Sequence, residues 1–351
     1  MSETAQRSVD PFAGTGGGSG SGNRFGSRIG RAGSVFLRQR EASVFIVAVV
    51  LVLYFGVISS ASSAFFSKLN LENVSYGTSA FAIIAIGEVL LLVCGEIDLS
   101  VGYIWTLSPF LMYFFASYYG FPLILAIVAA LVCGAIIGLI NGLLVVWLKV
   151  PSFIATLGTS FVIFGFTLVT SAAQEKTMPP GFVSLGRWFG GFAWAEIIWA
   201  VVLVVIFHIV LTRTRWGLHT VATGGNMLGA SESGISVARI KLGNFMFTGV
   251  LGAVAGILES FRVGTVDPSA GGYTPMFYAV AAAVIGGTAL AGGSGTVGGA
   301  LIGMLVLAIL QDGFNLLGIS ANPFLIILGV AIIAAMIANV YLTRLRRAGR
   351  S

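Results

Sequence analysis

RTRWGLHTVATGGNMLGASESGISVARIK, residues 213–241, is the longest polar interruption in the middle of a chain that is otherwise dominated by apolar runs. Four basic residues flank a centre rich in Gly, Ser and Asn. Unpaired polar groups are expensive in hydrocarbon, so this stretch is expected to lie in water on one side of a membrane. The function of the chain depends on the side of the membrane where this stretch lies and on the partner that binds it there.

Composition agrees with a membrane environment. Of 351 residues, 57% are hydrophobic and only 9% are charged, against roughly 25% charged residues in typical soluble domains. The mean hydropathy is +0.97. The net charge of +6 arises from basic residues at the ends and in loops, which is typical of membrane orientation and not of a nucleic-acid interface. The sequence therefore predicts an all-α polytopic membrane protein.

The apolar runs have the length of about 20 residues that is needed to cross a hydrocarbon core about 30 Å thick. The ten expected spans cover residues 44–66, 76–94, 99–119, 122–148, 152–172, 194–212, 243–262, 276–291, 297–316 and 323–343. The segment 276–291 is short and rich in small residues, which indicates a re-entrant or broken helix. Glycines recur every fourth residue at 134, 138 and 142, at 252 and 256, and at 295, 299 and 303. Such stripes let helices approach closely, so we expect a compact bundle.

Charge sets the expected orientation. Residues 1–43 read as a disordered, Arg-rich tail, residues 44–343 as the transmembrane domain and residues 344–351 as a basic tail. With ten spans, fifteen Lys and Arg fall on the side of both termini and four on the other side. Because positive charge favours the cytoplasm, both termini and the segment 213–241 are expected there, in a cell inner membrane.

Catalytic chemistry is not indicated. Residues 293–298, GSGTVG, match G-x-G-x-x-G, but no strand pattern precedes them, so a hinge between two membrane helices is favoured over a dinucleotide site. No P-loop motif is present, and His208 and His219 lack metal-ligand spacing. The sequence predicts neither an enzyme nor a bound metal or cofactor.

Acidic residues fall inside or beside apolar runs, where ionisable groups are expensive and usually functional. Glu96 and Asp98 lie at a span junction on the cytoplasmic side, where Asp98 is positioned to cap the next helix. Glu88 and Asp312 lie deeper. For each of these two acids, two roles stay open: a structural hydrogen bond, or a position that lines a pore or an interface. The acids form no obvious ion pathway.

Four blocks of sequence resemble the permeases of bacterial ABC importers for monosaccharides, the ribose-type group. They are GEIDLSVG at 95–102, GLINGLLVVWLKVPSFIATLGT at 138–159, GGNMLGASESGISVARIK at 224–241 and AAAVIGGTALAGGSGTVGGALIG at 281–303. The chain departs from the family pattern at Glu96, where glycine is usual, and at Gly229, where alanine is usual.

The resemblance implies a permease that works as a pair of membrane subunits, with a second copy of this chain favoured. Cytoplasmic ATPase subunits would bind the ATP, and an external sugar-binding protein would deliver the sugar. Residues 224–237 would form a short cytoplasmic helix in a groove of the ATPase. The candidate coupling residues are Gly224, Gly225, Asn226, Gly229, Ala230, Ser233, Gly234 and Ile235. Small side chains would let the surfaces approach, and Asn226 would hydrogen-bond or cap.

The implied mechanism is alternating access, in which ATP binding at the partner moves the segment and tilts the bundles. An uncharged sugar needs weak, replaceable hydrogen bonds along its path. Candidates around the break at Pro151 are Asn141, Ser152, Thr156, Thr159 and Ser160, with Asp98 as a structural or path residue. Helix packing is the alternative for each of them.

Other functions stay open at this stage. A permease for branched-chain amino acids or nucleosides would share the cytoplasmic segment. An ion-coupled secondary carrier would work without an ATPase and would depend on Glu88 or Asp312. A non-transporting scaffold is the third alternative.

Overall fold

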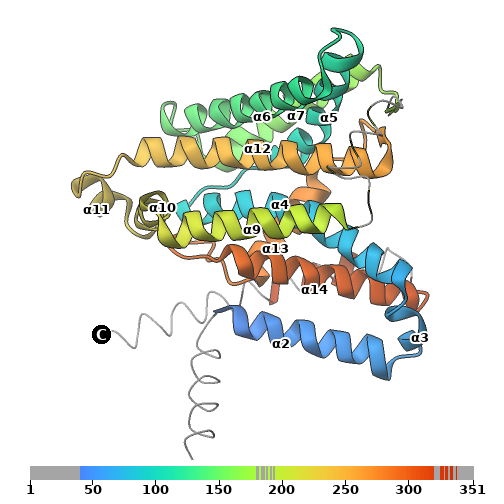
Figure 1. Ribbon diagram of the computed structural model, residues 1–351. Helices are drawn as coiled ribbons and strands as arrows, with labels where there is room; N and C mark the ends of the chain where they lie inside the picture. Colours follow the sequence, from blue (N-terminus) through green and yellow to red (C-terminus); the bar gives the residue numbers. More distant parts are fainter. Residues whose placement is uncertain are drawn as a thin grey trace, which may run out of the picture. The chain divides into compact units, whose positions relative to one another are not determined.

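The computed structural model describes residues 40–178 and 194–319, together with isolated positions between 182 and 192 and between 325 and 337. Residues 1–39, the C-terminal tail 344–351 and more than half of the tenth expected span lie outside the described residues. The described part is a bundle of α-helices (Figure 1). The predicted all-α architecture is therefore confirmed.

Helices carry the first nine expected spans. They are α2 (Arg40–Leu53), which continues into the π-helix η1 (Tyr54–Ile58), α4 (Lys68–Cys94), α5 (Val101–Ser117), α6 (Leu123–Val146), α7 (Ser152–Ser171), α9 (Ala195–Arg213), α12 (Val237–Val263), α13 (Tyr273–Ile285) and α14 (Val297–Leu316). Seven of these are long and apolar enough to cross a membrane, and α5 and α13 are shorter.

Two expected boundaries are wrong near the start of the bundle. The first span, expected over 44–66, ends at Ile58, and the separate short helix α3 (Ser62–Phe65) follows. Helix α4 begins eight residues before the expected start of its span. The reason is a cap: the Ser67 hydroxyl accepts a hydrogen bond from the Asn70 amide at 3.3 Å, which satisfies a donor in the first turn.

Helix α13 is short, as the composition of 276–291 indicated. Its 13 residues span roughly 20 Å, less than the roughly 30 Å of a hydrocarbon core. It ends at Ile285 and not at residue 291. Gly287, Gly292 and Gly293 in the following turn have positive φ, which a helix does not accommodate. The sequence GSGTVG, residues 293–298, thus covers the end of the connection after α13 and the first two residues of α14, and the element directly before it is a helix and not a strand.

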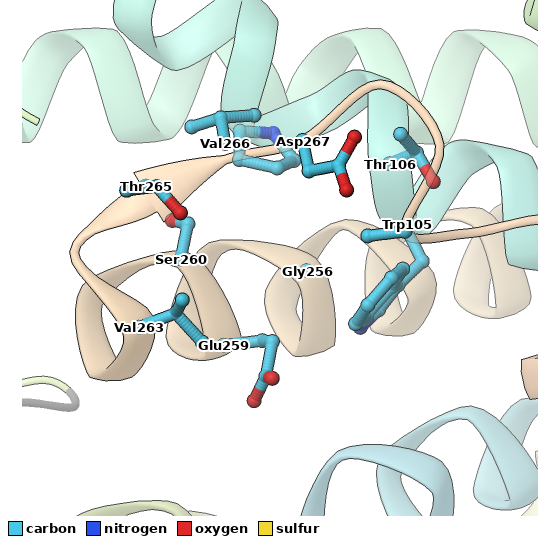
Figure 2. A pocket seen from close by; sticks show the side chains of 11 residues that line it. Trp105, Thr106, Gly256, Glu259, Ser260, Val263, Thr265, Val266 and Asp267 are labelled. Carbon is cyan, nitrogen blue, oxygen red and sulfur yellow. The ribbon is translucent and has the colours of Figure 1, made fainter. Parts of the chain in front are cut away.

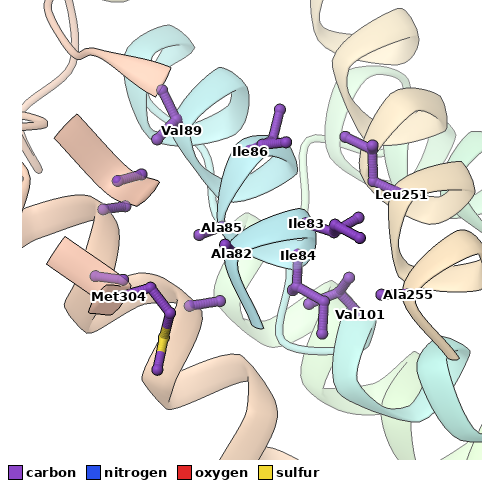
Figure 3. Close-up of a cluster of buried hydrophobic side chains, with 14 of the residues drawn as sticks. Ala82, Ile83, Ile84, Ala85, Ile86, Val89, Val101, Leu251, Ala255 and Met304 are labelled. Carbon is purple, nitrogen blue, oxygen red and sulfur yellow. The ribbon is translucent and has the colours of Figure 1, made fainter. Parts of the chain in front are cut away.

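Helix α4 forms the centre of the bundle and packs against α12, α13, α14 and α9. Of its most apolar window, 89% is buried inside the protein. Figure 3 shows the resulting core, in which the α4 side chains Ile83, Ile84 and Ile86 lie between Leu251 of α12 and Met304 of α14. By contrast, only 22–28% of the corresponding windows of α6, α7 and α9 is buried. Their exposed apolar faces fit a lipid environment.

The glycine stripes hold helices together, as predicted. A Cβ at Gly138 on α6 would lie 2.2 Å from the Phe245 carbonyl oxygen of α12. A Cβ at Gly303 on α14 would lie 2.3 Å from the Ala282 carbonyl oxygen of α13. Both distances are too short for any side chain, so these helix pairs need glycine to pack at this separation.

The bundle has two distinct ends. One carries the helices α10 (Arg215–Gly225) and α11 (Met227–Glu232), which project beyond the long helices (Figure 1). We call it the α10 end. The other carries an antiparallel ribbon of β1 (Lys176–Thr177) and β2 (Thr265–Val266), which the sequence analysis did not anticipate. We call it the β-ribbon end.

Candidate functional site

The polar segment that divides the sequence folds into α10 and α11. The Thr214 hydroxyl caps α10 by accepting from the Gly217 amide at 3.4 Å. Asn226 separates the two helices in an extended conformation, and its side-chain oxygen caps α11 by accepting from the Gly229 amide at 3.0 Å. The expected capping role of Asn226 is confirmed. The helix expected over 224–237 is shorter, because Gly224 and Gly225 belong to the last turn of α10.

Helix α10 is anchored to the bundle by a buried polar contact. The Trp216 indole nitrogen donates to the Asn244 side-chain oxygen of α12 at 2.9 Å. The Asn244 amide nitrogen donates in turn to the Leu90 carbonyl of α4 and the Thr220 hydroxyl of α10, both at 3.4 Å. Asn244 and Thr220 are fully buried. This contact joins α10, α12 and α4, and the sequence analysis did not identify it.

Gly224, at the end of α10, lies directly against backbone atoms of two other parts of this chain. A Cβ at this position would lie 1.9 Å from the Val93 carbonyl oxygen at the end of α4 and 2.8 Å from the Gly293 nitrogen. The Gly293 amide donates to the same Val93 carbonyl at 2.8 Å. The end of α10, the end of α4 and the turn between α13 and α14 therefore meet backbone to backbone. We call this contact the glycine junction.

The candidate coupling residues differ in exposure. Ala230 is 5% exposed and packs inward, so it does not present a surface to a partner. Gly225, Ser233 and Gly234 are exposed, whereas Gly229 and Ile235 are half-buried. The apolar side chains of Met227 and Leu228, which the sequence analysis did not name, are 56% and 71% exposed. Helix α11 thus presents two apolar side chains outside the bundle.

The GEIDLS sequence forms a turn at residues 95–100, between α4 and α5. The Asp98 carboxylate accepts hydrogen bonds from the Ser100 amide at 2.8 Å and the Ser100 hydroxyl at 2.6 Å, and Asn141 of α6 donates to it at 3.2 Å. Ser100, and not Asp98, is the N-cap residue of α5, so the expected capping role of Asp98 is corrected to fixing the turn before the helix. Burial raises the pKa of the Asp98 carboxyl, while the hydrogen bonds from Ser100 and Asn141 oppose the shift.

Helix α7 holds the same turn from another side. The Ser152 hydroxyl accepts from the Ile97 amide at 3.4 Å, and the Thr156 hydroxyl accepts from the Leu99 amide at 3.0 Å. Asp98, Asn141, Ser152 and Thr156 are thus gathered around one buried turn. Of the remaining candidates for a polar path, Ser160 hydrogen-bonds the Tyr273 hydroxyl of α13 at 3.0 Å, and Thr159 donates to a carbonyl of its own helix. Their place along a path stays a prediction.

An ion pair ties this turn to α12. Lys241, in the second turn of α12, hydrogen-bonds the Glu96 carboxylate, and the two side chains are only 15% and 10% exposed. Glu96 is one of the two positions where the sequence departs from the family pattern. The 95–100 turn therefore makes contacts that involve side chains with α6, α7 and α12. Lys241, its contact on α12, lies shortly after the end of α11 in the chain.

The deeper acids have different surroundings. Asp312 on α14 accepts a hydrogen bond from the Asn70 amide of α4 at 2.7 Å, which supports the structural alternative for Asp312. Glu88 on α4 is fully buried, and neither carboxyl oxygen has a hydrogen bond of good geometry within the described part of the chain. The alternatives for Glu88 stay open.

Taken together, the apolar helices, their lipid-compatible faces and the projecting α10–α11 segment define a polytopic α-helical membrane protein. A family model for the permease component of branched-chain amino acid transport systems matches residues 70–336. The chain belongs to this family of ABC import permeases.

Individual relatives cover nearly the whole chain. The xylose/arabinose import permease protein XylH of Sulfolobus acidocaldarius is 35% identical over 317 residues, which are 88% of this chain and 87% of that protein. The ribose import permease protein RbsC of Escherichia coli is 36% identical over 300 residues, 83% and 92% of the two chains. The fructose import permease protein FrcC of Rhizobium meliloti is 32% identical over 315 residues, 86% of each chain. No solved structure matches the chain.

Proposed function

We propose that this chain is the membrane-spanning permease subunit of an ATP-driven, binding-protein-dependent importer that carries a monosaccharide by alternating access. The relatives that cover more than four-fifths of the chain are named as permeases for ribose, xylose and fructose. The observation that carries the mechanistic part is the glycine junction, because it links the projecting α10–α11 segment to the ends of α4, α13 and α14.

A separate ATPase subunit is the proposed partner of the α10–α11 segment. The chain lacks a P-loop, so the ATP would be bound by the partner subunit. Met227 and Leu228 on α11 are suited to fill an apolar groove, since a short helix binds such a groove by inserting exposed apolar side chains. The exposed Ser233 and Gly234 would let the partner surface approach around them.

Motion of this segment would reach the bundle by two routes. The first is the glycine junction, where the backbone of α10 contacts Val93 and Gly293 without an intervening side chain. The second passes from α12 to the 95–100 turn through Lys241 and Glu96, and from there to α6 and α7. Because packed interfaces shift between discrete arrangements, a displacement of α10 would be transmitted and not absorbed.

The remaining partners follow from the same proposal. The α10 end would face the cytoplasm, because basic side chains such as Arg213, Arg215 and Arg239 are exposed there. The β-ribbon end would then receive the sugar from an external binding protein. A second copy of this chain would complete the path.

Uptake by proteoliposomes tests the proposal. The permease is reconstituted with its ATPase and its binding protein, and radiolabelled D-ribose, D-xylose, D-fructose and L-leucine are offered in turn. We expect uptake of a sugar only with ATP on the ATPase side, and no effect of a protonophore. Uptake of leucine alone would favour the amino-acid alternative suggested by the description of the family. Uptake without the ATPase would overturn the proposal.

A further inference from the structure

A small pocket opens at the β-ribbon end, far from the α10–α11 segment along α12. It has a volume of about 70 Å³ and is lined by residues from α5, the end of α12, β2 and the chain after β2. Figure 2 shows its polar lining, in which Trp105 and Thr106 face Glu259, Ser260 and Asp267. The pocket thus combines an aromatic ring, the three hydroxyls of Thr106, Ser260 and Thr265, and two carboxylates. None of these residues takes part in the contacts at the α10 end.

The pocket wall contains a hydrogen-bond donor without an acceptor. Trp105 is 7% exposed, and its indole N–H makes no hydrogen bond within the described residues. Leaving a buried donor unpaired destabilises a protein by the desolvation of that group. An acceptor brought by a ligand would remove this penalty.

The acceptors around the pocket are held in place. Arg262 binds Glu259 through two nitrogens, one of them 2.9 Å from the carboxylate, and lies 3.5 Å from the buried Glu196. Arg262 therefore fixes Glu259 and offsets its charge. The exposed Asp267 accepts the Ser269 amide with one oxygen at 2.7 Å.

This set of groups matches the hydroxyls of a sugar. Each sugar hydroxyl both donates and accepts, so it uses carboxylate and hydroxyl acceptors together with an N–H donor. A hard cation such as Ca²⁺ or Mg²⁺ would call for oxygen ligands only, and the Trp105 N–H donor does not fit that requirement. The volume is well below the roughly 300 Å³ of a pocket that encloses a small ligand. It therefore accommodates one edge of a monosaccharide and not the whole ring.

We propose that this pocket is a hydroxyl-binding subsite that receives one edge of the sugar as it enters the permease. The proposal rests on the transport function proposed above and adds an entry position with named contacts. Trp105 donates to a sugar oxygen, and Asp267 and Glu259 accept from adjacent hydroxyls.

Two variants remove single contacts. Trp105→Phe retains an aromatic ring but lacks the N–H, and Asp267→Asn retains an oxygen for the Ser269 amide but lacks the charge. Glu72→Gln is the matched control, because Glu72 is an acid near the start of α4 at the same end, paired with Lys68 at 3.9 Å and not in the pocket. Initial uptake of D-ribose, D-xylose and D-fructose is measured with ATP hydrolysis in the same proteoliposomes.

We expect Trp105→Phe and Asp267→Asn to lower the sugar moved per ATP by roughly five- to tenfold, the value of one hydrogen bond. The binding-protein-stimulated hydrolysis should persist, and Glu72→Gln should match the unmodified protein. Discrimination against a deoxy analogue of the transported sugar should also shrink, because a lost contact no longer penalises the missing hydroxyl.

Unchanged uptake per ATP in both variants, or equal loss of uptake and hydrolysis, would overturn the subsite. If Trp105→Phe does not fold, Asp267→Asn at its exposed position decides alone. Failure of the unmodified transporter to take up any sugar would instead refute the proposed function.

Discussion

Replacing Gly224 with alanine is expected to separate ATP hydrolysis from transport. The added methyl group would lie 1.9 Å from the Val93 carbonyl oxygen, so α10 would have to withdraw from α4 by about 1 Å or more in a close-packed region. If α10 stayed in place, the methyl group would instead crowd the hydrogen bond from Gly293 to Val93, because it would lie 2.8 Å from the Gly293 nitrogen. Overpacking of this kind destabilises by about 1–3 kcal/mol.

The neighbouring glycine provides the control. A Cβ at Gly225 would lie 3.8 Å from the Gly293 Cα, an ordinary contact. Gly225→Ala therefore makes the same chemical change in the same helix without the clash. Uptake and ATP hydrolysis are measured together in proteoliposomes, and thermal unfolding of the solubilised protein is measured alongside.

For Gly224→Ala we expect roughly tenfold less sugar moved per ATP, since 1.4 kcal/mol corresponds to a factor of ten. For Gly225→Ala the ratio should stay within about twofold, because surface substitutions usually change stability by at most 0.5 kcal/mol. If the two variants couple equally well, the glycine junction does not transmit the movement of α10, and the reasoning is refuted.

Three further predictions address other contacts. Glu96→Gln or Lys241→Met should each lower the free energy of unfolding by about 1–3 kcal/mol, because the charge that remains is nearly buried. The double exchange Glu96→Lys with Lys241→Glu should restore part of the lost stability, as measured by thermal unfolding. Single variants as stable as the unmodified protein would contradict this prediction. Gly234 has φ +81° and open space around it, so Gly234→Ala should reduce uptake per ATP through about 1–2 kcal/mol of backbone strain, whereas Gly234→Asn should retain most of it. A ratio in Gly234→Ala equal to that of the unmodified protein would show that this turn has no part in coupling. Glu88→Gln and Asp312→Asn should both retain ATP-driven uptake in the presence of a protonophore; loss of uptake in either would favour an ion-coupled carrier.

Features that follow from local pattern could be predicted from the sequence. Apolar length located nine of the spans, because hydrocarbon leaves few alternatives to a helix. The four-residue spacing of Gly134 and Gly138 indicated a tight helix contact, which the structure places between α6 and α12. The capping role of Asn226 could be predicted because its side chain is of a type that caps helices. In the structure its side-chain oxygen accepts the predicted hydrogen bond from the Gly229 amide.

Features that depend on how helices face one another could not be predicted. Glu96 and Lys241 are 145 residues apart, and no periodicity links them. Gly224 was recognised as important but assigned to a partner surface, because nothing in its sequence neighbourhood indicates the Val93 carbonyl. Asp98 was taken for a helix cap because it precedes an apolar run by a few residues. Its actual partners include Asn141, which only the packing of α6 brings near.

Site-directed cross-linking between this chain and its ATPase subunit tests the central claim most directly. Cys94 and Cys133 are first replaced by alanine, and a single cysteine is placed at Leu228 on α11 or at Leu69 near the β-ribbon end. The two leucines are 71% and 70% exposed, so their reactivity should be alike. With a photoreactive maleimide, we predict that the ATPase is captured from position 228 and not from position 69. Capture from neither position, or equally from both, would contradict the assignment of the α10–α11 segment as the contact with the ATPase.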